Sequence, residues 1–132
     1  MAVEYRSGEA ALPVEAFVGL ARLIWAREYD ASRTSAALRS TINIGAWSDG
    51  RLIGSVRVLS DGYFFSTVAE VMVDPSFRRQ GIGLELMRRA LDETPGGLLF
   101  VAAQPGQERF FEQAGFRRGP TGYVGRRPAR AS

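Results

Sequence analysis

The sequence predicts a mixed α/β (α+β) domain in which helices flank a mostly antiparallel sheet. Residues 42–73 contain three apolar runs of β type, and Asp-Gly turns join them. Residues 82–93 follow with apolar positions at helical spacing. Residues 98–103 form a short apolar run typical of a buried strand, and a strand–helix–strand connection brings its two strands together in parallel. The expected sheet is therefore mixed.

The first part of the chain predicts an edge strand and two helices. Residues 3–5 can begin the strand, and Pro13 opens a helix with a broad apolar face that ends near residues 27–30. A second, shorter helix fits residues 32–41, where Ser32 is the expected N-cap. These helices are expected to cover one face of the sheet.

The rest of the chain alternates strands and helices. The predicted strands are residues 42–48, 51–60, 64–73 and 98–103, and the main helix covers residues 82–93. A final helix follows Pro105 and ends at Gly115, the expected left-handed C-cap, and Phe116 begins a last hairpin that runs through residues 123–127. No linker or repeat interrupts the chain, so we expect a single domain over residues 1–132 with a loose tail at 127–132.

The composition excludes several kinds of chemistry. The chain has no cysteine and no histidine, which excludes a thiolate zinc site, a cysteine acyl-enzyme and the commonest general base. The acidic residues show no metal-binding spacing, so no metal site is expected. No apolar run is long enough to span a bilayer, and the N-terminus lacks the form of a signal peptide. We therefore expect a cytoplasmic protein without a membrane partner.

All 17 basic residues are arginine, and the formal net charge is +3. A basic chain can indicate nucleic-acid binding, but these arginines are spread along the sequence and cluster only in short pairs. An anionic cofactor would explain the pair Arg78-Arg79. A nucleic-acid partner is therefore not expected.

A glycine-rich turn links the predicted central strand to the main helix. Val71-Met72-Val73 is followed by Asp74-Pro75 and then by Arg78-Arg79-Gln80-Gly81-Ile82-Gly83. The first N–H groups of a helix have no partner within the helix and carry partial positive charge, so such a turn can bind phosphate. Glycine at 81 and 83 would let a pyrophosphate approach the backbone.

These residues resemble the GNAT superfamily of acyl-CoA-dependent N-acyltransferases. Residues 78–83 meet its signature Arg/Gln-x-x-Gly-x-Gly/Ala, and residues 73–78 resemble its Val-x-Pro-x-x-Arg approach. Residues 105–116 look like the later family motif that closes with Phe-Tyr-Glu-x-x-Gly-Phe. A dinucleotide fingerprint would need glycine at Leu86, and a P-loop would need a lysine. The resemblance implies a sheet splayed at its parallel strand pair, with acetyl-CoA in the gap.

The resemblance also implies which residues hold the cofactor. Backbone groups of two strand residues would pair with the pantetheine arm, amides of the glycine turn would hold the pyrophosphate, and two later side chains would flank the arm. The expected cofactor-binding residues are Met72, Val73, Arg78, Arg79, Gln80, Gly81, Ile82, Gly83, Leu84, Gln104 and Phe111.

The expected reaction is direct attack of an amine on the thioester in a ternary complex. Glu70 interrupts an apolar strand and is the candidate proton acceptor, although a solvent-facing position fits equally well. The N–H of Val73 is the family-style donor to the developing oxyanion. Phe111 stands where many relatives have a proton-donating tyrosine. The donor is therefore Tyr123, Tyr63 or water, or the leaving thiol needs none.

The acceptor amine would lie on the other side of the sheet. Candidate residues for its binding are Trp25, Glu28, Tyr29, Asp61 and Glu70, as acidic groups or aromatic walls. The expected function is acetyl transfer to a small-molecule amine. The alternatives are a protein or peptide N-acetyltransferase and a non-catalytic acyl-CoA sensor. Many relatives dimerise, so a homodimer is possible on the same resemblance.

Overall fold

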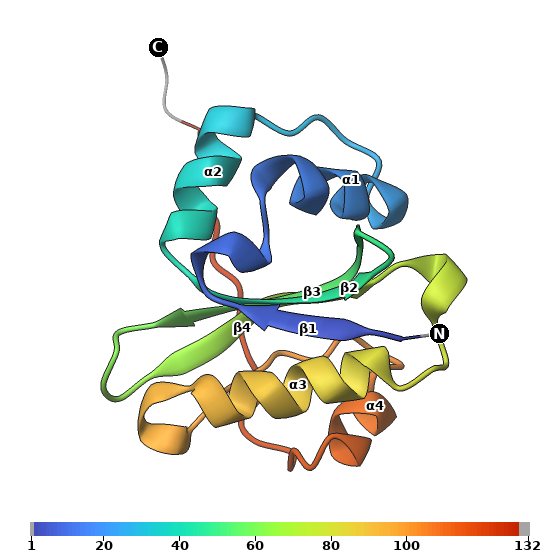
Figure 1. The fold of residues 1–132 in the computed structure, drawn as a ribbon. Helices are drawn as coiled ribbons and strands as arrows, with labels where there is room; N and C mark the ends of the chain where they lie inside the picture. Colours follow the sequence, from blue (N-terminus) through green and yellow to red (C-terminus); the bar gives the residue numbers. More distant parts are fainter. Residues whose placement is uncertain (1, 130–132) are drawn as a thin grey trace.

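A computed structural model describes residues 2–129. One antiparallel sheet of four strands, in the order β1-β2-β3-β4, forms the centre of the fold (Figure 1). The strands are β1 (Glu4–Ser7), β2 (Ile42–Ser48), β3 (Arg51–Ser60) and β4 (Ser66–Val73). Tight turns after β2 and β3 place consecutive strands side by side, as the sequence predicts.

Helices cover both faces of the sheet (Figure 1). One face carries α1 (Val14–Ile24) and α2 (Ala31–Arg39), and the other carries α3 (Ile82–Glu93) and α4 (Glu108–Gln113). Three single turns of 3-10 helix connect these elements: η1 (Glu9–Ala11), η2 (Pro75–Phe77) and η3 (Pro95–Gly97). Within residues 2–129, no helix combines the length and the apolar character needed to cross a bilayer.

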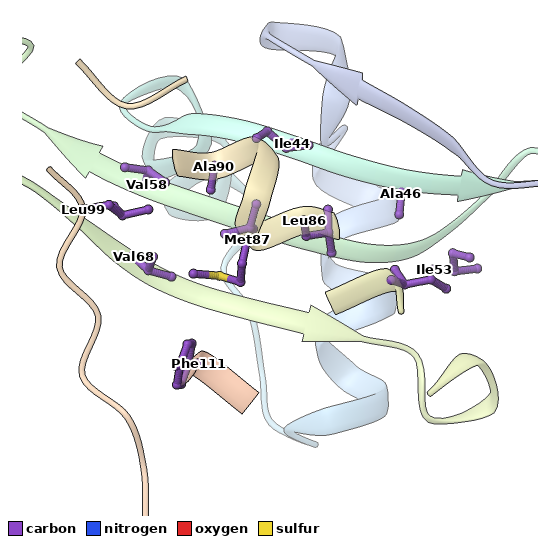
Figure 2. Packing of buried hydrophobic residues seen from close by; sticks show 12 residues of the cluster. Ile44, Ala46, Ile53, Val58, Val68, Leu86, Met87, Ala90, Leu99 and Phe111 are labelled. Carbon is purple, nitrogen blue, oxygen red and sulfur yellow. The ribbon is translucent and has the colours of Figure 1, made fainter. Parts of the chain in front are cut away.

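Each helical layer has its own apolar core. Leu86 and Met87 of α3 are fully buried against Ile44 and Val58 of the sheet (Figure 2). On the opposite face, Phe17 and Leu20 of α1 share a second buried cluster with Trp47, Leu52 and Met72. The apolar spacing that predicts α1 and α3 is therefore the spacing that buries them.

The predicted strand limits at β2 and β3 and the limits of α3 are confirmed, and other limits differ for local reasons. α2 begins one residue earlier than predicted because the side chain of Asp30, not Ser32, accepts the N–H of Arg33 at 2.8 Å. β4 begins at Ser66 and not at residue 64, because the Asp61 carboxylate accepts the three preceding N–H groups. α1 ends at Ile24, and the first strand is Glu4–Ser7.

The predicted parallel strand at 98–103 is reduced to one bridge. The N–H of Val68 donates to the carbonyl of Phe100 at 2.9 Å, and the N–H of Phe100 donates to the carbonyl of Ser66 at 2.9 Å. The direction is parallel, as expected. The segment is not buried on both faces, because Leu98 is 63% exposed while Leu99 is buried.

The C-terminal part of the chain has the predicted helix cap but not the predicted hairpin. α4 ends at a Schellman turn, in which Gly115 has φ 93° and the N–H of Phe116 donates to the carbonyl of Phe111 at 3.0 Å. This confirms the predicted C-cap. Residues 115–129 then contain neither helix nor strand. Glycine and proline recur along this segment and weaken strand formation. Of the predicted tail at 127–132, residues 130–132 lie outside the described residues.

A bulge separates the two halves of β4. Arg57 pairs with Glu70, but the next residue of β3, Val58, pairs with Val68, so Ala69 is an extra residue on β4. A bulge bends its strand and increases the local twist. The bulge lies directly after the bridge to Phe100, and the rest of β4 runs on without a partner on that side.

The first two turns of α3 are stabilised by Glu85. Its carboxylate accepts hydrogen bonds from Arg88 at 2.5 Å and from Arg89 at 2.6 Å, and it lies near the positive end of the helix. The hydrogen bonds from Arg88 are the largest cause that lowers the pKa of Glu85 to about 2.

Replacing Glu85 with Gln is therefore expected to destabilise the protein in a pH-dependent way. A depressed carboxyl pKa contributes stability above the unfolded value, and this stability is lost as the pH falls from about 4.5 towards about 2. Because the side chain is partly in water, we expect a loss of about 0.5–1 kcal/mol at pH 7. Urea unfolding at pH 7 and pH 2.5 measures it. Glu112→Gln, in exposed α4 sequence, is the control; equal losses at both pH values would contradict the assignment.

Candidate cofactor and acceptor site

The turn before α3 presents free backbone N–H groups. Arg79 and Gly81 both adopt left-handed conformations, with φ of 64° and 80°, and they redirect the chain into the helix. The first helical hydrogen bond runs from the N–H of Glu85 to the carbonyl of Gly81 at 3.1 Å. The N–H groups of residues 82–84 thus have no partner inside the helix. This arrangement suits a phosphate group.

The outer edge of β4 presents a second row of backbone groups. The N–H of Asp74 donates to the carbonyl of Ile53 at 2.8 Å, which makes these two a hydrogen-bonded pair. Pairs in an antiparallel ladder alternate, so the adjacent pair of Val73 and Gly54 is not hydrogen-bonded. The N–H and C=O groups of Val73, and of Val71 two residues earlier, therefore point away from β3. They lie at the open edge of the sheet.

Both rows meet in one cleft of about 540 Å³ between β4, the start of α3 and α4. Its lining includes residues of α3 and α4, the two helices that cover the same face of the sheet (Figure 1). The lining residues come from β4, the glycine turn and the region of α4: Val71, Val73, Phe77, Arg78, Arg79, Gly81, Ile82, Gly83, Leu84, Gly106, Gln107, Phe110, Phe111 and Gln113.

Most of the predicted cofactor residues lie in this cleft. The structure brings together Val73, Arg78, Arg79, Gly81, Ile82, Gly83, Leu84 and Phe111. Met72 is buried in the core under α1, and its backbone faces β3 by the alternation described above. Gln80 and Gln104 are exposed and do not line the cleft. Sequence reasoning missed Val71 and Phe110, although the alternation of a strand edge points to Val71 once Val73 is chosen.

The two motif glycines have different roles. A Cβ on Gly81 would meet nothing within 4 Å, so the backbone there is open to a ligand, and its φ of 80° favours glycine. A Cβ on Gly83 would lie 3.0 Å from a ring carbon of Phe110. Gly83 therefore allows α4 to pack on α3. A side chain at position 83 would point towards Phe110 and not into open space. The expectation that the missing side chain of Gly83 makes room for pyrophosphate is therefore wrong.

The predicted proton donors are not at the cleft. Phe111 is buried, and its ring packs edge-on against Phe110 at 4.9 Å between centroids (Figure 2 shows its position under the sheet). Tyr123 is 97% exposed in the segment without regular structure, and Tyr63 is 75% exposed in the turn before β4. Neither tyrosine lines the cleft, so the structure does not support them as donors.

Glu70 lies on the other face of the sheet, in an ion pair. Its two carboxylate oxygens accept hydrogen bonds from Nε and Nη2 of Arg57 at 2.6 and 2.7 Å. Both side chains are less than one-fifth exposed. The guanidinium also lies 5.5 Å from the ring centroid of Phe17 in α1. Glu70 is therefore a paired and mostly buried carboxylate, not a solvated surface group.

The other acceptor candidates lie in the β3–β4 turn and in the connection between α1 and α2. The carboxylate of Asp61 caps the β3–β4 turn, and hydrogen bonds from the N–H groups of residues 63–65 lower its pKa. Trp25, Glu28 and Tyr29 belong to the α1–α2 connection, where the Tyr29 hydroxyl donates to the carbonyl of Trp25 at 3.1 Å. Asp61 thus has a structural role.

Comparison with known proteins identifies the family. The sequence profile of the acetyltransferase (GNAT) domain matches residues 19–123. The chain belongs to the GNAT acetyltransferase family. This confirms the resemblance and the fold class that it implies.

The curated relatives of this GNAT domain are longer proteins. A histone acetyltransferase from Glycine max is 35% identical over 78 residues, which cover 57% of this chain and 34% of that protein. A chloroplastic GCN5-related N-acetyltransferase from Arabidopsis thaliana is also 35% identical over 78 residues, with 57% and 30% covered. The matched part spans about a third of these relatives.

Solved structures share the fold over nearly the whole chain. An aminoglycoside acetyltransferase of type AAC(6')-Iy, in complex with a CoA-linked bisubstrate analogue, has a TM-score of 0.77 at 16% identity and covers 98% of this chain and 100% of its own. A GNAT-family acetyltransferase from Streptococcus pneumoniae TIGR4 has a TM-score of 0.75 at 21% identity, with 96% and 100% covered. At these identities the likeness shows the fold alone.

The different roles of the two glycines can be tested by substitution. Gly83→Val is expected to cost about 1–3 kcal/mol of stability by overpacking against Phe110, and to weaken CoA binding because α4 must move. Gly81→Ala is expected to cost about 1–2 kcal/mol through its left-handed backbone alone. Urea unfolding and calorimetry with CoA measure both effects.

The matched control is Gly19→Ala in α1, where a Cβ has free space at ordinary helical φ. It is expected to stabilise the protein by up to about 1 kcal/mol and to leave CoA binding unchanged. If Gly83→Val changed neither stability nor CoA binding, the close contact with Phe110 would not be needed for the packing of α4 on α3.

Proposed function

We propose that this domain transfers an acetyl group from acetyl-CoA to a primary amine of a small molecule, by direct attack in a ternary complex. The observation that carries the proposal is the meeting of two rows of free backbone groups in one cleft. The start of α3 suits a diphosphate, and the edge of β4 suits an amide-containing arm. Acetyl-CoA contains both in that order and supplies an activated acetyl thioester.

The phosphate end of the cleft is positively charged. The N–H groups of residues 82–84 and the side chains of Arg78 and Arg79 would hold the diphosphate. The open conformation at Gly81 lets the ligand reach the backbone without meeting a side chain. Gln80 is exposed at the same turn and remains a predicted contact at the rim.

The edge of β4 would hold the arm and the reacting carbonyl. Val71 and Val73 offer the backbone groups that an added strand would use. The Val73 N–H is the proposed donor to the oxyanion that develops during attack. With no cysteine in the chain, a cysteine acyl-enzyme is excluded, and direct transfer is the simplest route.

The proton from the amine is proposed to pass to Glu70. Glu70 and Val73 are three positions apart, about 10 Å along an extended strand, so water would bridge the amine and the carboxylate. Glu70 still has lone pairs to accept a hydrogen bond beside Arg57. A thiol with a pKa of about 8.5 is a good leaving group near neutral pH, so the position of Phe111 needs no acid.

A small-molecule acceptor is proposed because aminoglycoside acetyltransferases are among the proteins that share this fold, over 97–100% of their own length. The plant histone acetyltransferase, matched over about a third of its length, is the reason for keeping a protein acceptor as an alternative. A second candidate is a sensor that binds acetyl-CoA without turnover, which the phenylalanine at 111 favours. A homodimer stays a prediction.

The proposed function is tested by release of free CoA in the presence of a panel of small amines. Because the chain has no cysteine, every thiol detected comes from CoA. Arg78→Ala combined with Arg79→Ala is expected to raise the KM for acetyl-CoA about tenfold or more, with little change in kcat, because charge-assisted contacts to phosphate are lost.

The control is Arg126→Ala combined with Arg127→Ala, which changes the net charge equally in an exposed segment. It is expected to leave the KM unchanged. Tight binding of acetyl-CoA without release of CoA on any amine would favour the sensor. Absence of binding in calorimetry would refute both functions.

A further inference from the structure

The pair of Arg57 and Glu70 lies at a special place on β4. Glu70 follows the bulge at Ala69, where the strand leaves its parallel neighbour and its outer edge becomes free. The Glu70 side chain lies on the α1 face, opposite the cleft that Val71 and Val73 line. A group that approaches the edge of β4 from the α1 side would meet this pair.

Two uncharged side chains lie beside the pair. Arg57 lies opposite Asn43 of β2 in the sheet, and the Asn43 amide donates to the carbonyl of Leu38 at 2.8 Å. From α1 the ring of Phe17 lies against the guanidinium. Arg57 is the partner cation on β3, and Glu70 the carboxylate on β4. The formal charges of the two side chains cancel.

The cancelled charge would affect which protonation state of an amine acceptor binds beside the pair. A half-buried carboxylate without a partner would attract the ammonium form of the amine and stabilise it, because opposite charges about 4 Å apart interact strongly away from bulk water. The ammonium form has no lone pair and cannot attack a carbonyl. A carboxylate already neutralised by a guanidinium can still accept a hydrogen bond from an amine but adds little preference for the charged form.

We infer that Arg57 is a positioning residue that keeps the acceptor amine reactive, by neutralising Glu70 so that the site binds the neutral amine and does not trap the ammonium ion. The inference rests on the proposed acetyl transfer. It assigns a role in acceptor protonation to a residue outside the cofactor cleft.

The chemical step balances without a further reactant. The acceptor loses one proton before attack, and the nitrogen lone pair then forms the C–N bond to the acetyl carbonyl carbon. The C–S bond breaks and the electron pair leaves on sulfur. The second nitrogen proton passes through water to Glu70 and from there to solvent or to the thiolate, so the products are the amide and CoA.

The test is the pH dependence of kcat at saturating acetyl-CoA and acceptor, because this profile reports ionisations in the ternary complex. In Arg57→Gln, Glu70 loses its partner, and the pH of half-maximal kcat is expected to rise by about one pH unit or more, equivalent to a tenfold change. The acceptor KM at pH 7 is expected to fall in the same variant. Arg57→Lys keeps a cation and is expected to stay near the wild-type profile.

The double variant Arg57→Gln with Glu70→Gln removes both charges. Its kcat is expected to be lower because Glu70 is gone, but its half-maximal pH is expected to return to the wild-type position. A purely structural role predicts lower melting temperatures and lower kcat at every pH with an unmoved midpoint. That result, or a double variant that keeps the shift of Arg57→Gln, would overturn the inference.

A wild-type measurement decides the question if Arg57→Gln does not fold. For a series of amines of different basicity, the half-maximal pH of kcat is expected at or below the pKa of each free amine. Values consistently above those pKa values would show ammonium trapping and overturn the inference. If no amine releases CoA from the wild-type protein, the proposed function itself fails, which is a different result from an active enzyme with unshifted profiles.

Discussion

The separation of β4 from the segment after η3 is the constraint on which the site depends. The two are joined at Phe100, and the bulge at Ala69 then turns the strand away. Backbone groups of Val71 and Val73 are left without partners at the sheet edge. Unpaired backbone groups at a sheet edge cost free energy when they are buried and promote aggregation when they are exposed. Here the edge borders a cleft whose other wall is the start of a helix, which is why we propose that the unpaired groups bind the ligand.

Several charged side chains of the domain already form hydrogen bonds or ion pairs within the fold. Asp30 caps a helix, Asp61 holds a turn, and Asp74 pairs with Arg51 and accepts the N–H of Ser76. Of the acidic residues that the sequence suggests as substrate ligands, Asp61 holds this turn and Glu70 is paired with Arg57. The arginines beside the glycine turn differ, because they line the cleft and form no ion pair with a carboxylate of residues 2–129.

The sequence predicts the parts of this structure that local patterns determine. The Asp49-Gly50 turn defines the limits of β2 and β3, and helical spacing defines α3. The wall of the cleft at the start of α3 follows from one glycine motif, because its residues are consecutive in the sequence, whereas the wall near α4 depends on packing between distant segments. The partner of Glu70 could not be predicted, because the pairing with Arg57 depends on strand register and a bulge. The prediction of a last hairpin is wrong for a local reason. Apolar residues after Phe116 suggest strands, but glycine and proline in the same segment disfavour them.

The close contacts around α3 also bear on how the domain responds to a ligand. At Gly54 of β3 a Cβ would lie 3.1 Å from side chains of Ile82 and Leu86, and at Gly83 it would crowd Phe110. The first turns of α3 are thus closely packed against β3 at Gly54 and against Phe110 at Gly83, and sliding the helix would create overlaps on one side and voids on the other. The amides at the start of α3 should therefore point in the same direction with and without a ligand. The entropy of ordering the proposed diphosphate site would then be lost during folding and not at each binding event.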